Sequence, residues 1–130
     1  MANKELQKIL YAEDEDDIRA IAQIALEDIG GFTVTYCSNG QKMVEAAQNF
    51  IPDLLLLDVM MPEMDGPTTL RELRKLPEFS DIPAIFMTAK IQSNEVADYK
   101  SIGAIDVISK PFDPITLAET IKKAWLKYNG

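Results

Sequence analysis

Hydrophobic and polar positions follow two alternating patterns along the chain. Short apolar runs, several rich in the β-branched and aromatic residues that strands favour, occur at residues 6–12, 32–37, 52–57, 82–87 and 104–109. Between them, apolar residues recur at the three- and four-residue spacing of helices, over residues 16–29, 43–50, 67–76, 93–102 and 114–125. The pattern therefore predicts five strands, each followed by a helix.

Local signals mark several of the predicted helix ends. Gly30 and Gly31 follow the first helix, where glycine suits the left-handed conformation past a helix end. Pro67 is a favoured first-turn residue for the third helix. Asp113 is expected to cap the last helix, with Pro114 at its first position.

The run of four leucines at residues 54–57 is apolar on both faces, as a parallel strand covered by helices should be. Alternating strands and helices over 130 residues predict a single doubly wound α/β domain, residues 1–130. The order of the strands does not follow from this pattern. We expect no further domain, and a protein that stands alone rather than a domain excised from a larger protein, although the second alternative stays open.

Composition narrows the range of possible functions. The chain has 13 basic and 21 acidic residues, a net charge of −8, which makes it a poor candidate for binding nucleic acid and a good one for attracting a cation. It contains no histidine, which excludes an imidazole base or a histidine-ligated metal. A single cysteine, Cys37, forms no internal disulfide, and no apolar run approaches the roughly 18 residues of a membrane span. We expect a cytoplasmic protein that does not bind membranes.

Chemically active residues gather where the predicted strands end. Glu13 and Asp14 follow the first strand, Asp58 ends the third, Thr88 the fourth and Lys110 the fifth. In open α/β sheets, ligands bind beyond these carboxyl ends. Each residue alone has an ordinary explanation, such as acidic residues at an exposed helix start. Together they indicate a site.

The charges of this predicted site conflict without a cation. Two carboxylates about 4 Å apart repel by about 4 kcal/mol at an effective dielectric constant of about 20. Three carboxylates would not stay ionised together with Lys110 as their single counter-charge. Magnesium binds through one or two carboxylates, keeps several waters and pairs with phosphate oxygens. The sequence therefore predicts an acidic Mg²⁺ pocket that handles a phosphoryl group.

Four segments, in order, carry a resemblance to a known family: "ILYAEDE", "LLLLDVMMPEMDG", "IFMTAK" and "ISKPF". Residues 6–128 resemble a response-regulator receiver domain of two-component signalling. The resemblance implies a flavodoxin-like (βα)5 fold with a parallel sheet in the order 2-1-3-4-5. In that order the first and third strands are neighbours, so Asp14 and Asp58 should face each other.

The resemblance also implies roles for the acidic residues. Asp58 would be the phosphoacceptor, attacking a phosphohistidine as a carboxylate nucleophile. Asp14 and Asp58 would ligate Mg²⁺ by their side chains, and Met60 by its backbone carbonyl. Glu13 would act through a water. The protein would be a signalling phosphoacceptor that catalyses only its own phosphorylation and dephosphorylation.

Lys110 would pair with Asp58 and then with a phosphoryl oxygen, while Thr88 would hydrogen-bond another phosphoryl oxygen. The Lys110–Pro111 peptide would be cis. Because the chain lacks histidine, a sensor histidine kinase or a histidine phosphotransfer protein must donate the phosphoryl group. A downstream protein target would bind the face formed by the fourth helix, the fifth strand and the fifth helix.

Two positions depart from the family pattern. Glu13 stands where many members have aspartate, and its extra methylene should still reach a metal-bound water. Val107 stands where members commonly have a tyrosine or phenylalanine that moves inward with the threonine. Because valine has no ring to move, we expect activation to shift the region of the fourth helix more weakly or by another route.

Met60 and Lys90 occupy positions that tune the rate of phosphoryl hydrolysis in the family.

Two other functions stay open. One is a receiver-like protein-binding module that is never phosphorylated, which the joint presence of the site residues disfavours. The other is a phosphatase with an aspartyl nucleophile. Such an enzyme usually needs a second acid two residues after the nucleophile, and that position is Met60.

Overall fold

The computed structural model describes residues 5–89 and 93–129. Five parallel strands form one sheet in the order β2-β1-β3-β4-β5, so the order implied by the family resemblance is confirmed. The strands are β1 (Lys8–Ala12), β2 (Thr33–Cys37), β3 (Leu54–Asp58), β4 (Ala84–Thr88) and β5 (Ala104–Ser109). Because β1 lies between β2 and β3, the chain winds outwards from β1 in both directions.

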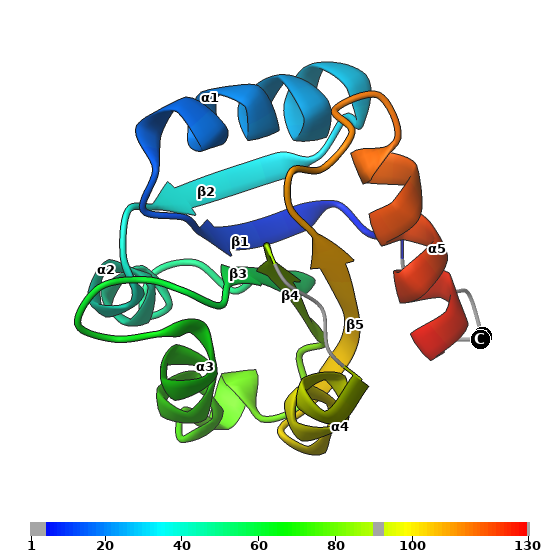
Figure 1. Ribbon diagram of the computed structural model, residues 1–130. Coiled ribbons are helices and arrows are strands. Elements are labelled where there is room, and N and C mark those ends of the chain that lie inside the picture. Colours follow the sequence, from blue (N-terminus) through cyan, green and yellow to red (C-terminus); the bar gives the residue numbers. More distant parts are fainter. Residues whose placement is uncertain (1–4, 90–92, 130) are drawn as a thin grey trace.

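Helices cover both faces of the sheet, which confirms the doubly wound architecture (Figure 1). They are α1 (Asp16–Gln23), α2 (Gly40–Ala46), α3 (Gly66–Arg74), α4 (Ser93–Ser101) and α5 (Leu117–Asn129), with a π-helical η1 (Ile24–Ile29) and a 3-10 turn η2 (Pro77–Phe79). α1 and α5 lie on one face and α2, α3 and α4 on the other. Within residues 5–89 and 93–129, none of these helices has the length and apolar character that crossing a bilayer requires.

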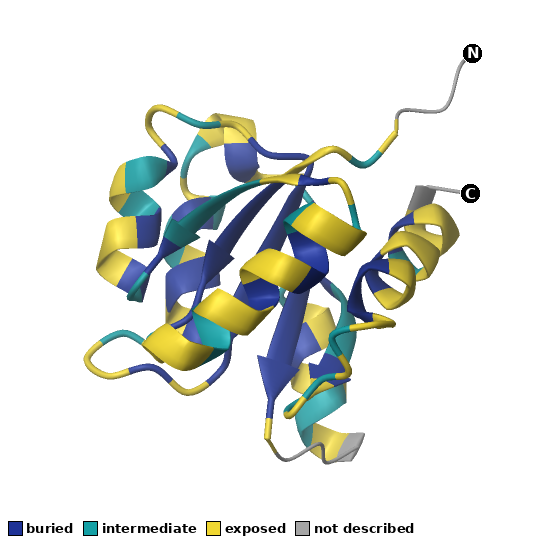
Figure 2. Cartoon of the chain, turned by 90° about the horizontal axis from the view of Figure 1, so that it is seen from above, coloured by how far each residue is buried: buried dark blue, intermediate teal, exposed yellow. Residues whose placement is uncertain are grey.

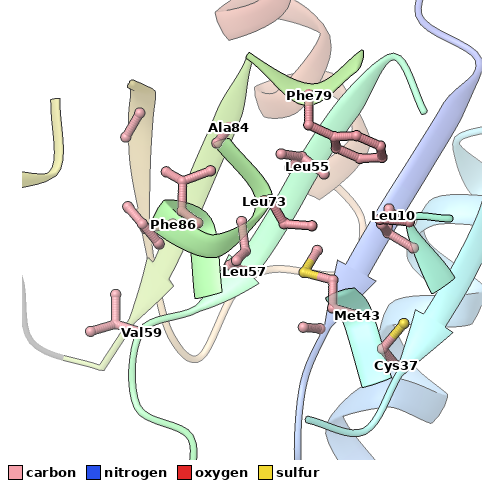
Figure 3. Close-up of a cluster of buried hydrophobic side chains, with 14 of the residues drawn as sticks. Leu10, Cys37, Met43, Leu55, Leu57, Val59, Leu73, Phe79, Ala84 and Phe86 are labelled. Atoms are coloured by element: carbon pink, nitrogen blue, oxygen red, sulfur yellow. The ribbon is translucent and has the colours of Figure 1, made fainter. Parts of the chain in front are cut away.

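The leucine run supplies the core on both sides of the sheet. Leu55 and Leu57 belong to one cluster of buried side chains, which Figure 3 shows beside Phe86 and Leu73. Their neighbours in the strand, at positions 54 and 56, belong to the second cluster, under α1 and α5. Because side chains alternate along a strand, four leucines in a row bury two on each face. Figure 2 shows the result, with the central strands buried, the edge strands partly buried, and the helices exposed on their outer sides.

One helix end agrees with the sequence expectation and another differs. The first helix ends before Gly30, as predicted, although it changes from α to π geometry at Ile24, where the N–H of Gly30 donates to the Ala25 carbonyl at 3.1 Å. Gly31 then ends it with a φ of +76°, a conformation that favours glycine. The prediction that Pro114 opens the last helix is wrong, since α5 begins at Leu117. The reason is local: residues 114–116 form a turn in which the Asp113 carboxylate accepts a hydrogen bond from the Ile115 N–H.

We predict that Leu55→Ala lowers the free energy of unfolding by about 2 to 5 kcal/mol, because it leaves a cavity beneath α3. The side chain is fully buried. Chemical denaturation followed by circular dichroism would measure the change. Leu126→Ala is the matched control. The Leu126 side chain is 58% exposed, so this substitution should change the free energy of unfolding by no more than about 0.5 kcal/mol. Equal costs for the two variants would contradict this account of the core.

Candidate functional site

The candidate site lies at the carboxyl edge of the sheet, where β1 and β3 are neighbours. In the register of these strands Ala12 pairs with Leu57. In each of the two strands the residue that follows this pair is acidic: Glu13 follows Ala12, and Asp58 follows Leu57. Two carboxylates separated by 45 positions in sequence therefore meet at one point because the strand order makes their strands adjacent.

Backbone hydrogen bonds hold the segments that leave these strands. The N–H of Glu13 donates to the Cys37 carbonyl at 3.0 Å. Beyond β3, the N–H of Val59 donates to the Met87 carbonyl at 2.9 Å. The N–H of Lys110 donates to the Thr88 carbonyl, also at 2.9 Å. Each segment is thus tied to the adjacent strand immediately after its own strand ends, which limits how far its side chains can shift.

Three carboxylates converge at this edge. One oxygen from each of Glu13, Asp14 and Asp58 lies within 4.8 Å of the others. Glu13 is fully buried and Asp58 is 3% exposed. Among the residues that the structure describes, the buried Oδ1 of Asp14 has no hydrogen-bond partner. A buried carboxylate oxygen without a donor is costly, and a hard cation bound by oxygen ligands would satisfy it. These residues therefore fit a Mg²⁺ ion.

Lys110 supplies a positive charge to the cluster and shares it between two carboxylates. Its Nζ lies 3.0 and 3.3 Å from the two carboxylate oxygens of Glu13 and 3.1 Å from Oδ2 of Asp58. The pairing with Glu13 was not foreseen from the sequence. Burial disfavours the ammonium, but the hydrogen bonds to Glu13 and Asp58 outweigh it and raise the pKa of Lys110. The lysine therefore stays charged.

Glu13 is the carboxylate whose titration is most disturbed. Burial raises its pKa from 4.5 to about 7, against the effect of the Lys110 hydrogen bond and together with the repulsion from Asp58. The direction follows mainly from burial, which disfavours the charged carboxylate, and the Lys110 ammonium, which is shared with Asp58, does not offset it. Near neutral pH the cluster thus holds a proton or a cation more readily than isolated acids would.

Two residues that sequence reasoning missed also hold Glu13. The hydroxyl of Tyr11, fully buried in β1, donates to Oε1 of Glu13 at 3.3 Å. Burial raises the pKa of Tyr11 above its ordinary value, so this hydroxyl is protonated and acts as a donor. Arg19, on α1, donates from Nη1 to the Glu13 carbonyl at 2.5 Å. A polar-tipped tyrosine inside an apolar strand was the available signal for the first of them.

The loop after β3 shapes the surroundings of Asp58. The N–H of Met60 donates to Oδ1 of Asp58 at 3.3 Å, while the Met60 side chain is 74% exposed. Asp65 caps α3 by accepting from the Thr68 N–H at 2.8 Å. At Gly66 a Cβ would lie 2.5 Å from the Asp58 carbonyl oxygen, so only glycine lets the loop return this closely. The "MDG" end of the motif thus closes the loop.

The remaining predicted residues surround the mouth of the site. Thr88 is buried at the end of β4, beside β3 and β5. The Lys110–Pro111 peptide is cis, as predicted. A hollow of about 310 Å³ opens over Asp58, lined with Met60, Ala89 and Lys110 among others. It gives a reactant access to a carboxylate that is otherwise buried. Lys90 lies outside the described residues.

Val107 is half-buried in β5 and pairs with Phe86 across the sheet. An aromatic ring packs on Phe86 from another element: Tyr99 of α4 lies with its ring centroid 5.0 Å from that of Phe86. The Tyr99 hydroxyl donates to Glu95 at 3.3 Å, within the same helix. The aromatic contact between β4 and α4 therefore comes from the helix and not from position 107.

The sequence matches the response regulator receiver domain over residues 9–122, and the chain belongs to this family. Among solved structures, the chemotaxis protein CheY4 of Vibrio cholerae superposes with a TM-score of 0.85 at 27% identity, covering 92% of this chain and 98% of that one. Response regulator Rre1 of Synechocystis sp. is 32% identical over 114 residues. The transcriptional regulatory protein CseB of Streptomyces avermitilis is 39% identical over 114 residues.

Each of these last two matches covers 88% of the present chain, which spans only about half of each relative, 49% of Rre1 and 47% of CseB. A 14.6 kDa protein of Leptolyngbya boryana differs in this respect: it is 32% identical over 120 residues, which cover 92% of this chain and 91% of that one. The similarity thus concerns the receiver domain, both in longer regulators and in a relative of similar size.

We predict that Glu13 makes the stability of the metal-free protein fall as pH rises. Its pKa of about 7 in the folded protein exceeds the ordinary 4.5, so between these values the unfolded chain loses a proton that the folded protein keeps. From pH of about 4.5 to about 7, the free energy of unfolding should therefore decrease relative to that of Glu13→Gln. Chemical denaturation in the presence of a chelator measures this difference.

Glu119→Gln is the control for this prediction, because Glu119 is an exposed glutamate on α5. The free energy of unfolding of this variant should depend on pH in the same way as that of the wild type. If Glu13→Gln also followed the wild-type curve, the raised pKa of Glu13 would be wrong.

Proposed function

We propose that this chain is a phosphoacceptor response regulator in which Asp58 receives a phosphoryl group from a phosphohistidine on a partner protein. The observation that carries the proposal is the meeting of three carboxylates, that of Asp58 among them, with one lysine beside a solvent-accessible hollow. Membership in the receiver family supports it. The protein acts as a signalling switch and catalyses only its own phosphorylation and dephosphorylation.

In the proposed reaction, a carboxylate oxygen of Asp58 attacks the phosphorus atom of the donor. The new P–O bond forms as the P–N bond to the donor histidine breaks, and the electron pair returns to the imidazole, which takes up a proton. The product on Asp58 is an acyl phosphate. Because β3 is buried on both faces, the attacking carboxylate is held at a fixed position on the sheet edge.

Charge stabilisation is the main contribution of the other residues. Asp14 and Asp58 would hold Mg²⁺ by their side chains and Glu13 through a water, and the ion would supply positive charge to the phosphoryl oxygens. Met60 would add its backbone carbonyl to this set. The Lys110 ammonium, already 3.1 Å from Asp58, is within reach of a phosphoryl oxygen after small movements.

Thr88 completes the site by hydrogen-bonding a further phosphoryl oxygen. Its hydroxyl is carried at the end of β4, the strand next to β3, and its carbonyl is already bonded to the Lys110 N–H. A phosphoryl group that attracts both Thr88 and Lys110 therefore pulls on adjacent ends of β4 and β5. This is the route by which phosphorylation would change the shape of the surface.

The partners follow from the chemistry. The chain has no histidine, so a sensor histidine kinase or a histidine phosphotransfer protein supplies the phosphoryl group. The output is a protein target that binds the face made by α4, β5 and α5. With a net charge of −8, neither nucleic acid nor an anionic membrane is an expected ligand, and we place the protein in the cytoplasm.

We predict that the purified protein gains a single phosphoryl group, seen by intact-mass spectrometry, when incubated with Mg²⁺ and a small acyl-phosphate donor. Asp58→Asn should abolish the adduct, because an amide is not a nucleophile of this kind, and chelation of Mg²⁺ should also abolish it. Asp98→Asn is the matched control, since Asp98 is exposed on α4 and should leave the adduct unchanged.

An adduct that persisted in Asp58→Asn would refute the assignment of the nucleophile. A wild-type protein that neither bound Mg²⁺ nor accepted a phosphoryl group, even from a histidine kinase, would support the alternative of an unphosphorylated binding module. Continuous release of inorganic phosphate with many turnovers would instead favour a phosphatase.

We further predict that Val107→Tyr enlarges the response of α4 to phosphorylation. Valine has no ring that can move inward with Thr88, so the wild-type protein should show smaller backbone amide shift changes in α4 on phosphorylation than the variant. Heteronuclear NMR of both proteins measures them. Val107→Ile is the control, since it adds volume without a ring. Equal changes in wild type and Val107→Tyr would contradict the idea that position 107 limits the coupling.

A further inference from the structure

Tyr11 places a hydroxyl group directly beneath the carboxylate cluster. The residue is the fourth of the five residues of β1, two positions before Glu13, and its side chain is fully buried. Its hydroxyl donates to Oε1 of Glu13 at 3.3 Å. A buried tyrosine hydroxyl normally needs a partner, and this one has its partner in the site itself.

The tyrosine ring is fixed by its neighbours and cannot easily turn away. Tyr11 pairs with Tyr36 in β2 and with Leu56 in β3, so it is enclosed by strands on both sides. The ring of Tyr36 meets that of Tyr11 edge-on, with centroids 6.0 Å apart. The Tyr36 hydroxyl donates to Glu27 at 2.8 Å, away from the cluster. The direction of the Tyr11 hydroxyl is therefore set by the core of the protein.

Glu13 has particular need of such a donor. Its side chain has one more rotatable bond than an aspartate would have, so holding its carboxylate in one place costs more conformational entropy. Lys110 also binds this carboxylate, but it binds Asp58 at the same time. In the proposed reaction Lys110 turns towards a phosphoryl oxygen. The Tyr11 hydroxyl then remains as the side-chain donor that keeps Glu13 in place, together with the Glu15 N–H at 3.3 Å from Oε2.

We propose that Tyr11 is a positioning residue of the metal-dependent site, and that its hydroxyl holds the Glu13 carboxylate in the orientation required for Mg²⁺ binding. This inference rests on the proposed function, because it assigns Glu13 to the Mg²⁺ site. It adds a partner for the glutamate that neither the sequence motifs nor the family resemblance indicated. Partners that orient metal-binding groups commonly change metal affinity by about 10- to 100-fold when they are removed.

The test compares Tyr11→Phe with the wild type by isothermal titration calorimetry with Mg²⁺ alone. Phenylalanine keeps the ring packed against Tyr36 and removes only the hydroxyl. We expect Mg²⁺ affinity to fall about tenfold. In phosphorylation by an acyl-phosphate donor, the Mg²⁺ concentration for half-maximal rate should rise by a similar factor, while the rate at saturating Mg²⁺ stays close to that of the wild type.

Two further variants separate positioning from general structure. Tyr36→Phe removes the neighbouring hydroxyl, which bonds Glu27 outside the site, and should bind Mg²⁺ like the wild type. In the Glu13→Asp background, Tyr11→Phe should have little further effect, because the shorter carboxylate does not reach the hydroxyl. This double-mutant cycle shows whether the tyrosine acts through Glu13.

Mg²⁺ binding by Tyr11→Phe that matched the wild type, or that was tighter, would overturn the inference while leaving the proposed function intact. The same holds if Tyr11→Phe weakened Mg²⁺ binding equally in the Glu13 and Glu13→Asp backgrounds. A wild-type protein that neither bound Mg²⁺ nor accepted a phosphoryl group would overturn the proposed function, and the inference with it.

Discussion

Unequal charge is the physical constraint on which this site depends. One ammonium, on Lys110, faces the three carboxylates of Glu13, Asp14 and Asp58 in a largely buried space. Two charges about 4 Å apart interact by about 4 kcal/mol at an effective dielectric constant of about 20, so the excess negative charge is a substantial cost. The protein without metal reduces it by sharing the lysine and by raising the pKa of Glu13. The same excess makes the edge of the sheet attractive to a divalent cation.

The rest of the fold keeps these charges together. A sheet buried on both faces fixes β1 and β3, and the segments that leave β1, β3 and β5 are tied to neighbouring strands by backbone hydrogen bonds. Gly66 then brings the loop after β3 back against the Asp58 backbone. In the proposed function the Asp58 carboxylate attacks phosphorus, and such restraint would favour that attack, because catalysis of phosphoryl transfer is mainly positioning and charge stabilisation. The core therefore serves the site directly.

Position 107 is where this chain departs from the pattern that the family resemblance implies. Position 107 carries valine, and the aromatic contact to Phe86 comes from Tyr99 on α4. Because Phe86 and Thr88 lie on the same face of β4, two residues apart, a change at Thr88 is adjacent to this contact. If phosphorylation moves Thr88, as we propose, the contact between Phe86 and Tyr99 would connect that movement to α4. Such a route would act on the same face of the protein that we propose for the output partner.

The sequence by itself determined the strands and helices, the burial of the leucine run on two faces and the acidic residues at the strand ends. These features follow from local periodicity and from residue type, which are visible along one chain. Strand order came from four motifs in sequence and not from periodicity. Only the tertiary structure decided that Lys110 pairs with Glu13 across 97 positions, that the Tyr11 hydroxyl bonds the same carboxylate, and that α5 begins at Leu117. A pattern specifies which side of an element is buried, whereas a pairing depends on distances that exist only after the strands have come together.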